Sequence, residues 1–93
     1  MSDTIEIIRK LGYDKNKEIS KIEFKEVEKK SIEERIHDID GGDNHLNEEV
    51  NNQRAKAIDK KKHIEREIVE LRDKIRDIDV EIQNLTLQLK YGG

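Results

Sequence analysis

The feature that most constrains this chain is an unbroken heptad repeat of Ile and Leu in its C-terminal third. The repeat positions follow one another at alternating intervals of four and three residues: Ile64, Ile68, Leu71, Ile75, Ile78, Ile82, Leu85 and Leu89. A period of 3.5 residues aligns such side chains as a narrow stripe along an α-helix, which is buried by packing on another helix. The pattern therefore predicts an all-α protein in which this stripe, called the ridge below, meets a second helix.

The composition is typical of long solvated helices and excludes several other classes of protein. Of the 93 residues, 44% are charged and 3% are aromatic, and Pro, Cys and Trp are absent. Because there is no cysteine, neither a disulfide nor a thiolate metal site can stabilise so small a chain, which leaves oligomerisation as the usual remedy. The net charge of −3 and the lack of a long apolar run argue against generic nucleic-acid and membrane partners. We expect a cytoplasmic protein without a cofactor.

The first half of the chain is expected to contain two helical segments. The first covers residues 4–11, with Asp3 as its cap and Gly12 as its end. The second covers about residues 17–39, where Ile residues recur at helical spacing. Within it, residues 17–30 also alternate in the manner of a half-buried strand, and this alternative stays open.

The segment "DGGDN", residues 40–44, is the strongest helix breaker in the chain, because Gly, Asp and Asn favour turn conformations. Either Asp43 or Asn44 is then expected to cap a long helix. The predicted organisation is a helical head at 1–43, followed by a long helix at 44–93 that includes a coiled-coil stalk at about 61–90.

The stalk is expected to pair with another copy of the chain. The helical segment before Gly41 is too short to reach Leu89 by folding back, and beyond about residue 68 nothing in the chain is left to cover the ridge. In a parallel pair the charges beside the ridge are opposite in sign, with Lys60 facing Glu65, Glu67 facing Arg72 and Lys74 facing Asp79. These pairs favour a parallel homodimer, and a trimer, an antiparallel dimer and a heteromeric coil stay open.

The predicted turn has some features of a calcium-binding loop. In "DIDGGDNHLNEE", residues 38–49, the candidate metal ligands are Asp38, Asp40, Asp43 and Glu49. Asp38, Asp40 and Glu49 match the first, third and twelfth positions of the EF-hand loop. Gly42 stands one position earlier than the glycine that shapes the turn in that loop. A solvated interhelical turn is therefore the expected state, and metal binding is the alternative.

The segment "GDNHLNEEVNNQR", residues 42–54, is similar to the acidic tip of the coiled-coil hairpin in bacterial Gre-type transcript-cleavage factors. That resemblance implies that Asp43 and Glu48 hold a metal ion inside an RNA polymerase. The downstream apolar residues depart from the family's spacing by about one helical turn, and the chain has no room for the family's second domain.

No motif for catalysis is present: the sequence lacks a cysteine nucleophile, a glycine-rich phosphate loop and an HExxH motif. We therefore expect a non-catalytic interaction protein, a self-associating regulator or adaptor that binds a larger protein. The residue usage is that of an AT-rich genome such as a phage. A structural scaffold is the alternative. The residues expected to contact the partner are apolar or aromatic and lie in the head: Ile5, Ile8, Leu11, Tyr13 and Phe24.

Overall fold

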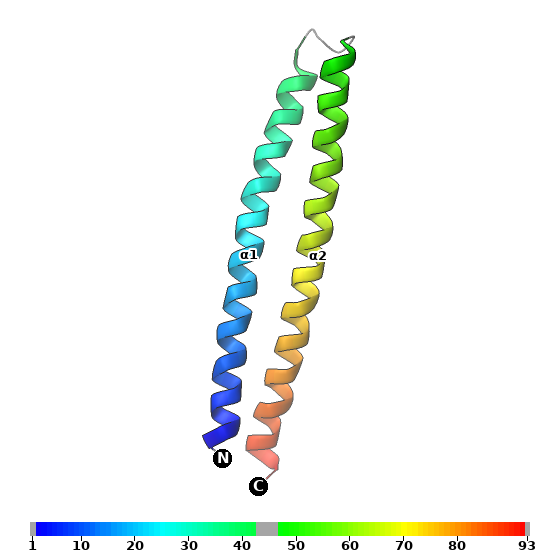
Figure 1. The fold of residues 1–93 in the computed structure, drawn as a ribbon. Helices are drawn as coiled ribbons and strands as arrows, with labels where there is room; N and C mark the ends of the chain where they lie inside the picture. Colours follow the sequence, from blue (N-terminus) through cyan, green and yellow to red (C-terminus); the bar gives the residue numbers. More distant parts are fainter. Residues whose placement is uncertain (1, 43–46, 93) are drawn as a thin grey trace. The chain divides into compact units, whose positions relative to one another are not determined.

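The computed structural model describes residues 2–42 and 47–92, and the fold of this part is all-α, as predicted (Figure 1). Helix α1 is Ser2–Asp40 and helix α2 is Glu48–Tyr91, with no strand among the described residues. The chain forms two compact units: unit 1 combines Met1–Ile22 with Glu70–Gly93, and unit 2 is Glu23–Val69. In the described part of the chain, neither helix is apolar over a long enough stretch to cross a membrane.

Helix α1 is one element, which corrects the predicted division into helices at 4–11 and 17–39. Gly12 lies inside it, and a Cβ atom added at this glycine would meet nothing within 4 Å. A glycine inside a helix costs about 1 kcal/mol relative to alanine. That amount is small beside the packing of a 39-residue helix, so the helix continues through it. Residues 17–30 are helical, which decides against the strand alternative.

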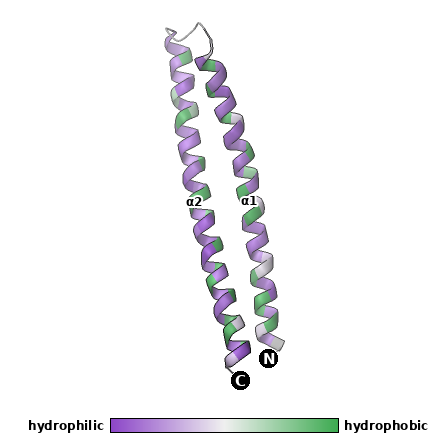
Figure 2. Ribbon diagram, turned by 180° about the vertical axis from the view of Figure 1, so that it is seen from behind, coloured by the Kyte–Doolittle hydropathy of each residue, from purple (hydrophilic) through white to green (hydrophobic). Residues whose placement is uncertain are grey.

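The face that α1 buries follows the same heptad spacing as the ridge, although half of its members are polar. Its positions alternate at intervals of four and three, and all of them are half-buried or buried: Thr4, Ile8, Leu11, Lys15, Glu18, Ile22, Lys25, Lys29, Ile32, Ile36 and Ile39. In Figure 2, α1 carries hydrophobic stretches separated by hydrophilic ones.

Unit 2 is a helical hairpin in which the end of α1 and the start of α2 run antiparallel. Its register is fixed by cross-helix ion pairs, since Lys25 pairs with Glu67 at 3.0 Å and Glu33 pairs with Lys61 at 3.6 Å. All the buried side chains of the described residues lie here: Ile32, Ala57, Ile64 and Ile68. The segment of α1 between Lys25 and Glu33 thus lies opposite the most buried part of the ridge.

Unit 1 pairs residues 2–22 of α1 with residues 70–91 of α2, again antiparallel. The described cross-helix ion pair joins Lys15 Nζ to Asp79 Oδ1 at 2.7 Å. No described side chain of this unit is fully buried. The pairing is therefore looser than in unit 2, although it covers part of the ridge that the sequence analysis assigned to another chain.

The turn between the helices begins one residue after Asp40. The amide of Gly41 donates to the carbonyl of His37 at 2.9 Å, and this bond closes the last turn of α1. Helix α2 is capped by Asn47, whose Oδ1 accepts a hydrogen bond from the amide of Glu49 at 2.9 Å. The helix thus begins later than predicted. The expected caps, Asp43 and Asn44, lie outside the described residues.

Candidate interaction surface

The ridge residues divide into three groups by burial. Ile64 and Ile68 are 2% and 3% exposed. From Leu71 to Leu85 the ridge is half-buried, and Leu89 is exposed. The ridge therefore contacts α1 within its own chain, and the cover that α1 gives it decreases toward the C-terminal end of α2.

The charges beside the ridge also have partners in the same chain. Two of the acidic residues expected to pair across a parallel dimer, Glu67 and Asp79, bind Lys25 and Lys15 of α1. These lysines stand at half-buried heptad positions of α1, and each reaches an acidic residue of α2 with its ammonium group. The charge pattern that favoured a parallel dimer thus supports the intramolecular antiparallel pairing.

The residues expected to bind a partner fall into two classes. Ile8 and Leu11 are half-buried and belong to the face that α1 turns toward α2 in unit 1. Ile5, Tyr13 and Phe24 are exposed, and Phe24 is the most exposed of the three at 72%. The ammonium group of Lys17 lies 4.7 Å from the centre of the Tyr13 ring, which is a cation–π contact.

Further exposed apolar residues were missed by the sequence analysis: Ile7, Val27, Val69, Val80, Leu87 and Tyr91. All of them stand off the heptad positions, and this was the signal that could have identified them. Val27 lies three residues after Phe24, so the two share the outer face of α1 in unit 2. The two form an adjoining pair of exposed apolar side chains on a highly charged helix.

At the turn end of unit 2, Arg54 binds Asp40 through two hydrogen bonds, Nε to Oδ1 at 2.6 Å and Nη2 to Oδ2 at 3.4 Å. The bond from Arg54 lowers the pKa of the Asp40 carboxyl; partial desolvation opposes this, and the charges of Arg54 and His37 add to it. The same contact raises the pKa of Arg54. The pair links the end of α1 to the start of α2.

The candidate metal ligands are not brought together within the described residues. Asp38 and Asp40 lie on the last turns of α1, Glu49 lies on the first turn of α2, and Asp43 lies outside the described part. Because Asp40 is bound by Arg54, its oxygens are already in use. Residues 2–42 and 47–92 contain no group of three side chains able to hold a metal ion.

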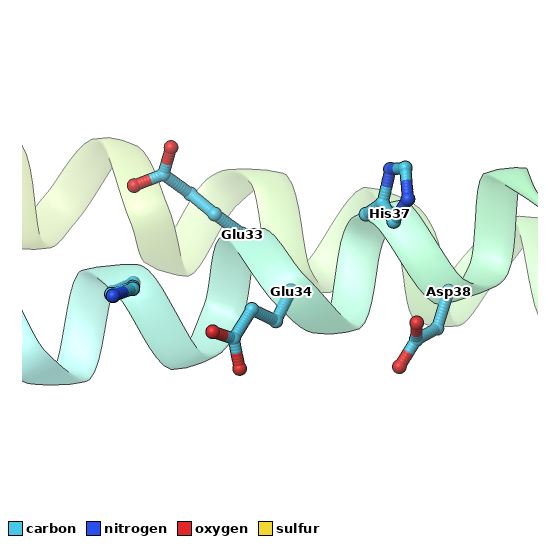
Figure 3. A pocket seen from close by; sticks show the side chains of 5 residues that line it. Glu33, Glu34, His37 and Asp38 are labelled. Atoms are coloured by element: carbon cyan, nitrogen blue, oxygen red, sulfur yellow. The ribbon is translucent and has the colours of Figure 1, made fainter.

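A shallow surface hollow lies on α1 of unit 2, next to His37. It is lined by Lys30, Glu33, Glu34, His37 and Asp38. In Figure 3, Glu33 and His37 point to one side of the helix, whereas Glu34 and Asp38 point to the other. Since the side chains diverge, the hollow offers no convergent set of groups for catalysis.

Neither protein-family models nor curated proteins nor solved structures gave a match to this chain.

Proposed function

We propose that this protein is a non-catalytic interaction module, a self-associating helical regulator or adaptor that binds a larger protein. The observation that carries the proposal is the imbalance between buried and exposed apolar side chains. Four apolar residues of the described part are buried, whereas ten large ones are exposed. Exposed apolar side chains that adjoin on one helix face, as Phe24 and Val27 do, are suited to contacts with a partner.

The outer face of α1 around Phe24 is the surface we assign to the larger partner. Phe24 and Val27 are among the most exposed apolar residues of the described part, and they lie away from the face that α1 buries. Aromatic side chains that fill a pocket on a partner contribute much of the binding free energy in protein complexes. Ile5 and Tyr13 are further contact residues in this proposal. A cytoplasmic location, in a host cell if the chain is phage-encoded, belongs to the same proposal.

Affinity capture from a lysate of the source organism tests the partner surface. The full-length chain with Phe24→Lys should lose the captured partner, because the substitution places a charge in an apolar contact. The matched control is Val69→Lys, which changes another exposed apolar residue of unit 2. If both variants capture the same proteins as the natural chain, the surface around Phe24 does not bind the partner.

The structural alternative is a scaffold, in which self-association is the whole function. Light scattering and capture separate the two functions, since a scaffold forms oligomers but retains no larger partner. This outcome would leave self-association standing and remove the adaptor role.

A second candidate is a hairpin that acts on RNA polymerase with a divalent metal, as the resemblance at residues 42–54 implies. The feature that favours it is the antiparallel hairpin of unit 2, which carries Glu48 beside its turn. Transcript cleavage by a stalled polymerase, measured with the natural chain and with Glu48→Gln, is the test. Cleavage unchanged by addition of the chain removes this candidate.

A further inference from the structure

The last turns of α2 in unit 1 differ from the rest of the chain in charge. Residues 82–89 contain no charged residue, although 44% of all residues are charged. The ridge occupies one face of this segment. On the outer face, Val80, Leu87 and Tyr91 are 50%, 46% and 74% exposed. A helix with apolar side chains on two opposite faces is normally covered on both, yet α1 covers only the ridge.

We infer that the outer face of the end of α2 binds the same face of a second copy of the chain, with the two α2 helices antiparallel. The face is formed by Val80, Asn84, Leu87 and Tyr91, and we call it the outer stripe. This inference rests on the self-association in the proposed function and names the surface that performs it.

The spacing of the outer stripe makes it self-complementary. Its members are separated by four, three and four residues, a sequence of intervals that reads the same in both directions. Two antiparallel copies therefore place Val80 level with Tyr91 of the second copy, and Asn84 level with Leu87 of the second copy. A two-fold interface requires this kind of reciprocal contact.

The charges at the two ends of the stripe favour the antiparallel arrangement. Glu81 and Lys90 are the charged residues that border the uncharged segment. In an antiparallel pair, Glu81 lies level with Lys90 of the second copy, so opposite charges meet at each end. A parallel pair would instead place Glu81 level with Glu81 and Lys90 level with Lys90, and like charges repel.

The size of the stripe indicates a weak dimer. With about 200 Å² for a tyrosine and about 100 Å² for an aliphatic side chain, the exposed fractions leave roughly 250 Å² of apolar surface on each chain. Even with the glutamines that flank it, the interface stays below the roughly 1,200 Å² at which standard stable interfaces begin. The expected dimer dissociates on dilution, with a Kd in the micromolar range or above.

Sedimentation equilibrium of the full-length chain, from about 10 µM to about 1 mM, tests the dimer. Val80→Lys should weaken it by about 100-fold or more, because each dimer then buries two unpaired charges. Val69→Lys is the matched control, since it changes the same residue type on the same helix at similar exposure (55%), and it should leave the dimer unchanged. Circular dichroism verifies that both variants keep the helical content of the natural chain.

Disulfide trapping tests the orientation, and the natural absence of cysteine gives a clean background. Val80→Cys mixed with Tyr91→Cys should form a mixed disulfide on oxidation. Neither variant should cross-link alone, because identical positions lie roughly 16 Å apart along an antiparallel pair, and a disulfide needs Cα atoms within about 7 Å. Disulfides formed by each variant alone would refute the antiparallel arrangement.

The sedimentation outcomes separate this inference from the proposed function. A natural chain that stays monomeric up to about 1 mM removes both the self-association and the outer stripe. A natural chain that dimerises equally well with Val80→Lys keeps the self-association and refutes the outer stripe as its surface.

Discussion

Replacing Ile64 with alanine should destabilise the protein more than a comparable substitution elsewhere on the helices. Ile64 is the most buried large side chain of the described residues, at 2% exposure. Truncation removes three carbon atoms, which accounts for about 2.4 kcal/mol of lost apolar burial. Any cavity left between the two helices adds to this loss, so the free energy of unfolding is expected to fall by about 2–4 kcal/mol.

The assay is urea unfolding followed by circular dichroism, at a low micromolar concentration where the proposed dimer is dissociated. The matched control is Ile7→Ala, which removes the same atoms from a side chain that is 47% exposed. The control should lower the free energy of unfolding by only about 1.2 kcal/mol, because half of that side chain already contacts water. If Ile64→Ala unfolds entirely, Ile64→Val gives the same comparison with an expected loss of about 1 kcal/mol. Equal losses for Ile64→Ala and Ile7→Ala would refute the pairing of α1 with the ridge in unit 2.

Three further substitutions test individual parts of the fold. Gly12→Ala should raise the free energy of unfolding by about 0.5–1 kcal/mol, since the added Cβ meets nothing within 4 Å and alanine is the better helix former. A loss of stability, measured by urea unfolding, would show that another helix approaches the glycine. Asn47→Ala should lower the free energy of unfolding by about 1 kcal/mol, because the amide of Glu49 loses its hydrogen-bond acceptor. An unchanged free energy of unfolding would argue against the cap. The contribution of Asp40 to stability is present above its unfolded pKa of about 3.8 and is lost as the pH falls through the lowered pKa of the folded state. Arg54→Gln should bring the Asp40 pKa, measured by NMR titration, back toward the ordinary value, and an unchanged titration would refute the contact.

The heptad ridge, the all-α class and the glycine turn could be predicted from the sequence, because each depends on local periodicity or backbone preference. Ile64 and Ile68 are buried at the positions that the 3.5-residue period gives them. What the period does not contain is the identity of the facing helix. An aliphatic stripe is equally complementary to a second copy and to a distant segment of its own chain.

The predicted division of α1 into two segments, with an end at Gly12, left no segment of the chain to face the C-terminal part of the ridge. Glycine is a common helix terminator, but its cost inside a helix is only about 1 kcal/mol. Tertiary packing over the full length of a helix exceeds that amount, and a single chain without an alignment gives no measure of it. The outer stripe was missed for a related reason, since Val80 and Leu87 lie off the heptad positions that defined the ridge.

The polar positions on the buried face of α1 explain why this helix pairs with α2 in one alignment. Lys15 and Lys25 interrupt the apolar stripe of α1. The sequence of α1 alone therefore does not identify this helix as the partner of the ridge. Their ammonium groups find Asp79 and Glu67 beside the ridge, and a shift by one heptad would leave those charges without their partners. Because half-exposed ion pairs contribute little free energy, their main effect is on specificity. Polar residues at the heptad positions between paired helices fix their register and orientation at a cost in stability. That cost is consistent with unit 1, in which no described side chain is buried.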